Sequence, residues 1–334
     1  MSDTTKHSIG VIGGGSWATA IVKILSTNEE KINWWVRNED NVSFIKKHGN
    51  NPSYLSSVSL DVNKIVVDSN LHHVLSKSDI VILAIPSAFT DGMMNQYNVT
   101  DLSNKIVFSA IKGIIPEHNL IVGDYLHKIK KVPIENIGVI TGPCHAEEVA
   151  MEKLSYLTIA SQNQKNATYV AEKMTTRFIK NTVSDDIYGT EYSGVLKNIF
   201  AIASGICHGL GYGDNFQAVL ISNAIQEIKR FVDAVHPITR DINSSAYLGD
   251  LLVTAYSQFS RNRTFGNMIG KGYSVKSAQM EMNMIAEGYY AVKCIKEINK
   301  HYQVHMPITD AVYNIVYEKI SPSIEIKLLT DKLS

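Results

Sequence analysis

The sequence predicts a two-part α/β fold, in which a domain built on a mostly parallel sheet is followed by an all-helical domain. Over residues 8–182, short apolar runs alternate with helical stretches, a pattern typical of a parallel sheet covered by helices. After about residue 189 the strand-like runs cease and helical periodicity remains. A length of 334 residues also favours two domains. We expect the boundary within the polar segment Ser184–Gly189, which gives domains of residues 1–188 and 189–334.

Seven short apolar runs in the first part are the candidate strands of this sheet. Ligands of such sheets bind at the carboxyl ends of the strands, so the loops that follow these runs are the first place to look for a site. The runs are Ser8–Ile12, Lys31–Val36, Lys64–Asp68, Ile80–Ala84, Lys105–Ser109, Asn136–Thr141 and Tyr156–Ala160.

Long helical stretches make up the second part of the chain, without a low-complexity tract or an internal repeat. Ser260 has the side chain of an N-cap residue, so we expect one more helix to begin directly after it. The other expected helices are Tyr192–Leu210, Phe216–Val235, Ser244–Ser257, Ile285–Asn299 and Thr309–Lys319.

The first candidate strand leads into a glycine turn that opens a helix, with the pattern Gly13-x-Gly15-x-x-Ala18. In this context the pattern indicates a site for the pyrophosphate of a dinucleotide. Gly13 permits the tight turn, Gly15 lets the pyrophosphate approach the backbone, and Ala18 lets helix and strand pack closely. The free N–H groups and the dipole of the helix start then hold the phosphates. An ordinary glycine turn is the alternative.

The end of the second candidate strand bears on which dinucleotide binds. In NAD enzymes an acidic residue about 20 positions after the glycines binds the ribose 2′-hydroxyl. Here that place reads Trp35-Val36-Arg37-Asn38, with no carboxylate to repel a 2′-phosphate and one arginine able to pair with it. NADP is therefore allowed and NAD is not excluded. Arg37 can equally be a solvated loop charge.

Lys112 follows the fifth candidate strand and precedes Gly113, close to the expected crevice at the edge of the sheet. The segment Ala84-Ile85-Pro86-Ser87, at the end of the fourth strand, is expected to border the dinucleotide there. Lys112 therefore either points into the crevice or is an exposed surface lysine, and its position alone favours neither.

Lys197 is the only Lys, Arg, Asp or Glu between Tyr192 and Gly213. On a helix it shares a stripe of small residues that lets a ligand or another backbone come close. A lysine held there loses hydration, and a nearby cation lowers its pKa further, which favours a neutral amine able to exchange a proton. The alternative is a lysine that reaches the surface at one helix end. The stripe consists of Ser193, Gly194, Ala201, Ser204 and Gly205.

A second cluster of polar residues lies between Asp250 and Arg263. Asp250 enters an apolar helical run and lies on the same helix face as Thr254. Arg261 and Asn262 are expected in the first turn after Ser260, where an arginine, an amide and a helix N-terminus form a plausible phosphate clamp. Alternatively, Asp250 caps its helix and Arg261 pairs with a surface acid.

Composition limits the other classes of function. Lys and Arg together number 32, as do Asp and Glu, so nothing suggests general attraction to nucleic acid or membranes. The cysteines, Cys144, Cys207 and Cys294, are odd in number and far apart, which argues against disulfides or zinc and for a reducing compartment such as the cytoplasm. We expect no targeting or membrane-spanning segment.

His145 with Glu147–Glu148 is the one arrangement that suggests a metal, but no second histidine stands at ligand spacing. We therefore expect these residues to form a loop or a helix start and the site to hold no metal.

Taken in order, these motifs resemble the bacterial-type NAD(P)-dependent glycerol-3-phosphate dehydrogenases over almost the whole chain. Cys144 and His145 depart from the family, which usually has Ser or Thr followed by Phe there. A thiol is a poorer hydrogen-bond donor than a hydroxyl. The matching motifs are Gly13-x-Gly15-Ser16-Trp17-Ala18-Thr19-Ala20, Ile111-Lys112-Gly113-Ile114, Gly142-Pro143-Cys144-His145-Ala146-Glu147, Leu196-Lys197-Asn198, Gly249-Asp250-Leu251-Leu252-Val253-Thr254, Ser260-Arg261-Asn262-Arg263 with Gly266, and Ala286-Glu287-Gly288.

The resemblance implies a Rossmann-like domain and a helical domain with the active site between them. It implies the reversible transfer of hydride between sn-glycerol 3-phosphate and dihydroxyacetone phosphate, which supplies glycerol 3-phosphate for phospholipid synthesis. Lys197 matches the family's proton acceptor, and Lys112 and Arg261 serve both ligands. The remaining cofactor contacts are Gly13, Gly15, Ser16, Trp17, Arg37, Ala146, Ile285 and Glu287, and the remaining substrate contacts are Gly142, Cys144, Asp250, Ser260 and Asn262.

Two other functions stay open from the sequence. A related two-domain dehydrogenase of hydroxy acids would use Arg261 to bind a carboxylate. A non-catalytic NAD(P)-sensing module would have no use for a desolvated amine at Lys197. The cofactor preference and the oligomeric state are not determined by the sequence, although the helical domain offers a face for a homodimer.

Overall fold

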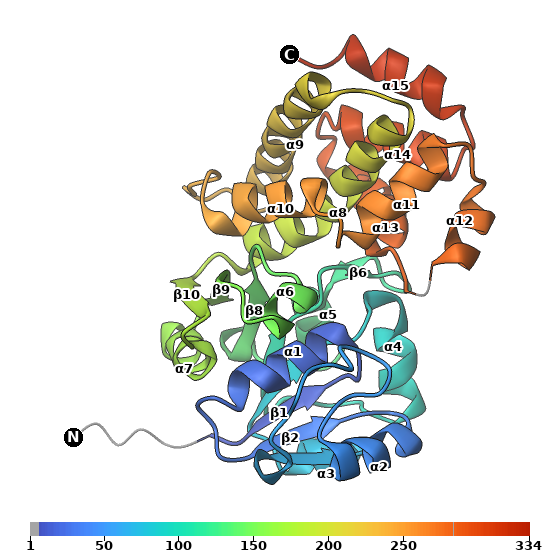
Figure 1. Ribbon diagram of the computed structural model, residues 1–334. Helices are drawn as coiled ribbons and strands as arrows, with labels where there is room; N and C mark the ends of the chain where they lie inside the picture. Colours follow the sequence, from blue (N-terminus) through green and yellow to red (C-terminus); the bar gives the residue numbers. More distant parts are fainter. Residues whose placement is uncertain (1–6, 283) are drawn as a thin grey trace.

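An eight-stranded sheet forms the centre of the N-terminal part (Figure 1). The computed structural model describes residues 7–282 and 284–334. All neighbouring strands are parallel except β8 and β9, which confirms the expected mostly parallel sheet. In the order β10-β9-β8-β5-β4-β1-β2-β3, the strands are β1 (Ile9–Ile12), β2 (Ile32–Trp35), β3 (Ile65–Asp68), β4 (Ile80–Leu83), β5 (Ile106–Ser109), β8 (Ile137–Thr141), β9 (Ser155–Ser161) and β10 (Ile179–Ser184).

Six of these strands have the order of a dinucleotide-binding fold, β3-β2-β1-β4-β5-β8. The order reverses between β1 and β4, so their carboxyl ends open a crevice where ligands of such folds bind. A small antiparallel pair, β6 (Ile114–Ile115) and β7 (Leu120–Ile121), lies outside the sheet.

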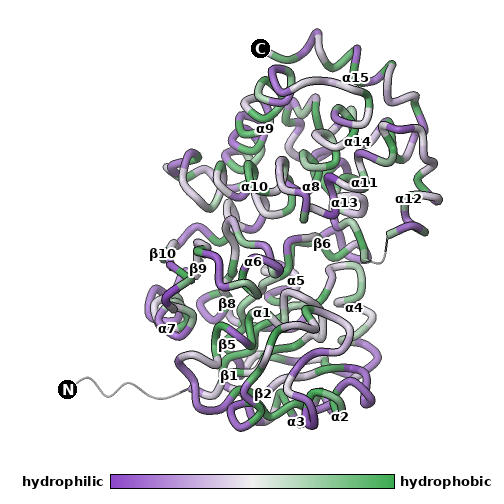
Figure 2. The backbone as a smooth tube through the Cα atoms, viewed as in Figure 1, coloured by the Kyte–Doolittle hydropathy of each residue, from purple (hydrophilic) through white to green (hydrophobic). Residues whose placement is uncertain are grey.

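Helices cover both faces of the sheet, and each face has its own apolar core. Strand side chains pack with α1, α2, α6 and α7 on one face and with α3, α4 and α5 on the other. The strands form an apolar layer between more polar helices (Figure 2). The helices are α1 (Ser16–Leu25), α2 (Glu39–His48), α3 (Leu71–Ser76), α4 (Ser87–Gln96), α5 (Val122–Lys128), α6 (Ala146–Ala150) and α7 (Gln164–Met174).

The C-terminal part is helical, as expected, and stands on the carboxyl edge of the sheet (Figure 1). Its central helix is α8, which packs against most of the other helices and against β8 and α5. The helices are α8 (Ile187–Gly209), α9 (Asp214–Val235), α10 (Asp250–Tyr256), α11 (Arg261–Gly270), α12 (Val275–Glu281), α13 (Glu287–Tyr302), α14 (Pro307–Val316) and α15 (Pro322–Thr330).

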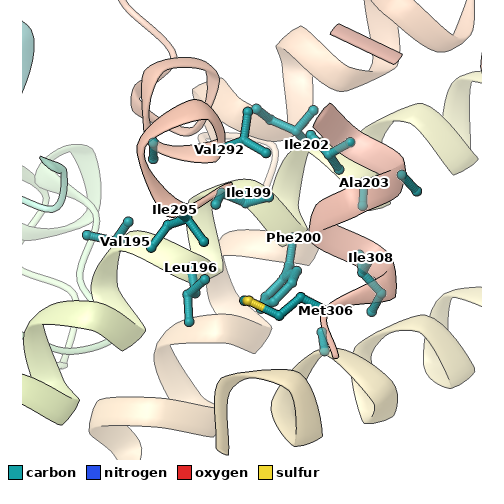
Figure 3. Packing of buried hydrophobic residues seen from close by; sticks show 14 of the residues in the cluster. Val195, Leu196, Ile199, Phe200, Ile202, Ala203, Val292, Ile295, Met306 and Ile308 are labelled. Atoms are coloured by element: carbon teal, nitrogen blue, oxygen red, sulfur yellow. The ribbon is translucent and has the colours of Figure 1, made fainter. Parts of the chain in front are cut away.

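The long helix α8 is buried because almost every side of it meets another element. Leu196, Ile199 and Phe200 pack with residues of α13 and α14 in one cluster (Figure 3). Against α11 the approach is so close that a Cβ on Gly205 would lie 2.1 Å from the carbonyl oxygen of Arg263. Because α8 is packed against other elements along most of its surface, the side chains on its sheet-facing side are held in defined positions.

The expected helix Ser244–Ser257 is divided. Residues Ser245–Gly249 form a π-helical turn, η3, and α10 begins only at Asp250. Ser260 is the N-cap of α11, as expected, because its Oγ accepts a hydrogen bond from the N–H of Arg263. Helices α12 and α15 were not expected from the sequence. No helix in the described part of the chain combines the length and the apolar character needed to cross a membrane.

Candidate active site

The turn after β1 has a backbone shape that only glycine adopts without strain. Gly13 has φ +139°, and a Cβ there would lie 2.3 Å from the carbonyl oxygen of Ala84. Its N–H donates to the carbonyl oxygen of Trp35 (3.1 Å), and its own carbonyl oxygen accepts from Nε1 of Trp34 (2.7 Å). The turn is therefore held by β2 and β4 at the point where the strand order reverses.

The start of α1 fits the pyrophosphate of a dinucleotide. Gly15 is the N-cap, and within residues 7–282 and 284–334 no side chain caps the helix and a Cβ on Gly15 would meet nothing within 4 Å. The first N–H groups of a helix lack partners within the helix and attract anions. Nε1 of Trp17 is buried without a hydrogen-bond partner among the described residues. Space and unused donors are therefore found together, next to the buried Ser16.

Glu287 of α13 forms a link from the helical part to this crevice. Its Oε1 accepts from the N–H of Ser87 (3.0 Å) and its Oε2 accepts from the Ser87 hydroxyl. Burial raises the pKa of the Glu287 carboxyl above its ordinary value. Ser87 begins α4 directly after Pro86, so the segment expected to border the dinucleotide is in contact with α13.

The other residues expected at the cofactor lie around the same edge. Arg37 is exposed just after β2, and Ala146 is buried as the first residue of α6. Ile285 is half-buried two residues before α13.

Two lysines and one aspartate meet between the two parts of the chain. Lys197 of α8 donates from Nζ to Oδ1 of Asp250, the first residue of α10. Lys112, from the loop after β5, donates to Oδ2 of Asp250 (3.3 Å) and to the carbonyl oxygen of Gly142 (2.9 Å). Asp250 is fully buried, and Lys197 is 4% exposed. Neither lysine is a surface residue, and Asp250 does not cap its helix.

The electrostatics of this cluster favour proton exchange. Burial lowers the pKa of Lys197 below its ordinary value, Lys112 adds to this effect, and the Asp250 carboxylate opposes it. Burial would raise the pKa of Asp250, but the two ammonium groups outweigh it and hold that pKa below its ordinary value. Asp250 is thus an anion shared by two cations, and Lys197 is an amine prepared to lose a proton.

The loop after β8 closes the cluster from the sheet side. Gly142 has φ +114° and offers its carbonyl oxygen to Lys112. Burial raises the pKa of the Cys144 thiol to about 12. Burial and the lysines lower the pKa of His145 to about 4. Thiol and imidazole are therefore uncharged near neutral pH, and His145 occupies the N-cap position of α6, as expected.

The start of α11 lies beside this cluster and was expected to bind phosphate. Arg261 is exposed, donates from Nη1 to Sδ of Met284 (3.7 Å), and forms no ion pair within the described part of the chain. The Asn262 side chain is buried and already engaged, since it donates to Oδ1 of Asn198 (2.9 Å) and accepts from the N–H of Gly288 (2.9 Å). The free donors at this helix start are therefore the guanidinium and the first N–H groups.

Two further residues belong to the cluster but were not singled out in the sequence. Asn198 donates from Nδ2 to the carbonyl oxygen of Lys112 (2.8 Å), and Oγ1 of Thr141 approaches Oδ2 of Asp250 at 3.4 Å. In the sequence, Asn198 was named only as part of the motif Leu196-Lys197-Asn198, without a role of its own. No group of histidine, cysteine, aspartate and glutamate suited to a metal ion occurs among the described residues.

Comparison with known proteins identifies the family. The family model for the N-terminus of NAD-dependent glycerol-3-phosphate dehydrogenase matches residues 8–167, and the model for its C-terminus matches residues 186–327. The chain is 36% identical, over 96% of its length and 94% of the relative's, to glycerol-3-phosphate dehydrogenase [NAD(P)+] of an Exiguobacterium species. It is 33% identical, over 94% of each chain, to the enzyme of that name from Staphylococcus aureus.

A solved structure agrees over both parts of the chain. Glycerol-3-phosphate dehydrogenase from Coxiella burnetii superposes with a TM-score of 0.89 at 28% identity and covers 97% of this chain and 99% of its own. Because the two family models together match most of the chain, the chain belongs to the NAD-dependent glycerol-3-phosphate dehydrogenase family.

Proposed function

We propose that this chain catalyses the reversible NAD(P)-dependent interconversion of sn-glycerol 3-phosphate and dihydroxyacetone phosphate. The observation that carries the proposal is the buried carboxylate of Asp250, which is shared by Lys197 and Lys112. It lies at the junction of the nucleotide-binding part and the helical part. We also propose that residues 1–188 bind the cofactor and residues 189–334 complete the substrate site, a division supported by the start of α8 at Ile187.

The cofactor supplies or takes up the hydride at C2 of the substrate. When the ketone is reduced, negative charge builds on its oxygen, and a positioned acid lowers the barrier by giving up a proton. Lys197 is that acid, because its depressed pKa makes proton loss easy while Asp250 still favours the ammonium form. In the reverse direction the neutral amine of Lys197 accepts the proton of the alcohol.

Lys112 stabilises the developing alkoxide. Its ammonium is held at two points, by Gly142 and by Asp250, so it needs little rearrangement when charge appears. Asp250 orients both amines, and it holds Lys197 protonated against the effect of burial. Lys197 thus transfers the proton, and Lys112 stabilises the negative charge.

The phosphate of the substrate binds at the start of α11. Arg261 offers an exposed guanidinium that forms no ion pair within the described residues, and the helix start adds its first N–H groups. Ser260 caps α11 and Asn262 anchors its first turn, so both support this phosphate site. Cys144 lies in the loop after β8, on the sheet side of the substrate site. Phosphate binding far from the reacting carbon positions the carbonyl for reduction.

The crevice between β1 and β4 binds the dinucleotide. Gly13, Gly15, Ser16 and Trp17 provide the turn and its donors, as the unpartnered Trp17 indole supports. The other contacts at its edge are Arg37, Ala146, Ile285, Glu287, Lys112 and Arg261. Arg37 is exposed just after β2 and would pair with a 2′-phosphate, which supports use of NADP as well as NAD.

Initial rates with both reduced cofactors test this proposal. Dihydroxyacetone phosphate should support rapid oxidation of the cofactor, and unphosphorylated dihydroxyacetone and keto acids should not. Preference for a keto acid would instead show a hydroxy-acid dehydrogenase. Cofactor binding without turnover of any of these substrates would show a sensing module.

The product is suited to supply glycerol 3-phosphate for phospholipid synthesis, and the three free cysteines support a cytoplasmic location. We propose a homodimer formed by the helical part, supported by Ile324 and Leu328, which are 56% and 52% exposed on one face of α15. Light scattering at a series of concentrations tests this, and a monomer throughout would contradict it.

A further inference from the structure

A buried group of three polar side chains lies where the sheet part joins the helical part. Asp186 stands between β10 and α8, and its Oδ2 accepts from the hydroxyl of Tyr247 (2.6 Å) and from Nε of Arg240 (2.8 Å). Its Oδ1 accepts from the N–H of Gly189 (2.9 Å) and so caps α8. We call Asp186, Arg240 and Tyr247 the Asp186 cluster.

The Asp186 cluster is buried and satisfied. Asp186 is 4% exposed, Tyr247 is 5% exposed, and 3% of the Arg240 side chain is exposed. The guanidinium also donates to Asp233 and to the carbonyl oxygen of His236 (2.8 Å). Burying charges is costly unless each has partners in good geometry. A cluster with so many directed bonds therefore fixes the relative position of the segments that carry it.

The segments that the Asp186 cluster fixes also carry Lys197 and Asp250. Asp186 caps α8, the helix of Lys197, and Tyr247 lies in η3 three residues before Asp250. In η3 the N–H of Gly249 bonds to the carbonyl oxygen of Ser244 (3.4 Å), the wider spacing of a π-helical turn. Among the described residues, no side chain caps η3. Since η3 packs against α8, and α10 lies beside α8 (Figure 1), an anchor on η3 sets where α10 begins.

We propose that Tyr247 is a positioning residue: its hydrogen bond to Asp186 holds the π-helical turn so that the carboxylate of Asp250 lies between Lys197 and Lys112. This inference rests on the proposed function of those three residues. The Tyr247 hydroxyl is engaged by Asp186, so its effect on the reaction passes through the position of Asp250. A catalytic group is precise only when its support is rigid, and displacement by about 1 Å can cost up to about 10²-fold in rate.

The protonation of Lys197 reports where Asp250 lies. Lys197 is faced by Asp250 from α10, by Lys112 from the loop after β5, and by Cys144 and His145 from the loop after β8. Of these described groups only Asp250 favours the ammonium. If its carboxylate moves away, the pKa of Lys197 falls and the loss of reductase activity at high pH begins at a lower pH.

The variant Tyr247→Phe tests this with little risk to the fold, because it removes one hydroxyl and leaves the ring and the other donors to Asp186. We expect kcat for dihydroxyacetone phosphate reduction to fall about tenfold. The alkaline limb of the pH profile should move toward acid, and KM for the reduced cofactor should stay unchanged.

Tyr125→Phe is the matched control. The hydroxyl of Tyr125, on α5, also donates to a buried carboxylate, Oδ1 of Asp91 on α4 (2.9 Å), and forms no hydrogen bond with Lys112, Lys197 or Asp250 among the described residues. Tyr125→Phe should lower Tm to a similar degree without moving kcat or the pH profile. Equal kinetic effects in the two variants, or wild-type kinetics in Tyr247→Phe, would overturn the inference.

A second measurement separates this inference from the proposed function. The pKa of Lys197, followed by NMR of isotope-labelled lysine side chains, should be lower in Tyr247→Phe than in the wild type, whatever substrate the enzyme uses. An unchanged pKa would overturn the role of Tyr247. A wild-type protein that does not reduce dihydroxyacetone phosphate would overturn the proposed function instead.

Discussion

Replacement of Asp250 by asparagine removes the charge that links the two lysines and keeps the size of the side chain. The Asp250 carboxylate is in direct contact with the Lys197 ammonium, and unit charges about 4 Å apart attract by about 4 kcal/mol at an effective dielectric constant of about 20. A single neighbouring charge usually moves a pKa by about 1–3 units. We therefore expect the pKa of Lys197 to fall by at least about one unit in Asp250→Asn.

The consequence is visible in the pH dependence of ketone reduction. Reduction needs the ammonium form of Lys197, so the rate falls as the pH rises through the pKa of that residue. In Asp250→Asn this limb should lie at least about one unit lower, and above it the rate should be at least about tenfold below wild type.

Initial rates with saturating dihydroxyacetone phosphate over a series of pH values measure this shift. Glu227→Gln, which alters another fully buried carboxyl group in the helical part, is the control and should leave the profile in place. A lower kcat with an unmoved alkaline limb in Asp250→Asn would refute the view that Asp250 sets the protonation of Lys197.

Three further substitutions test other parts of the site. Arg261→Ala should raise KM for phosphorylated substrates by about 10–100-fold in steady-state assays, and equal losses with glycerol and glycerol 3-phosphate would contradict the clamp. Gly13→Ala forces a Cβ to 2.3 Å from a carbonyl oxygen; it should abolish the fluorescence change on cofactor binding, and unchanged affinity would contradict the turn's role. Burial raises the pKa of Glu191 to about 8, so its stabilising contribution is present below about pH 4.5 and lost as the pH rises through about 8. Relative to Glu191→Gln, the Tm of the wild type should fall across that pH range. Parallel Tm curves for the two proteins would contradict the raised pKa of Glu191.

Much of the sheet could be predicted because its strands are short runs of β-branched residues buried on both faces. The edge strand β10 was missed because Ile179–Ser184 is mostly polar and only its first residue, Ile179, is buried. The pair β6 and β7 consists of two residues each, too short for any periodic pattern. The division of Ser244–Ser257 was also missed, because apolar spacing does not distinguish a π-helical turn from an α-helix.

The lysines and Asp250 could be singled out because a charged residue inside an apolar helical or strand-end segment is costly without a purpose. Their partners were harder to predict because these pairs are distant in sequence. Asn198 bonds to a residue 86 positions away, and Tyr247 to one 61 positions away. Neither bond leaves a mark in local composition, and only the fold brings the groups together.

The proton-transfer role of Lys197 is tested most directly by turnover of Lys197→Ala with dihydroxyacetone phosphate and a cofactor that it still binds. We predict that kcat falls by about 10²-fold or more while the dissociation constant of the reduced cofactor stays at the wild-type value. Near-normal turnover in this variant would contradict the mechanism, because the mechanism assigns the proton transfer to Lys197 and only charge stabilisation to Lys112.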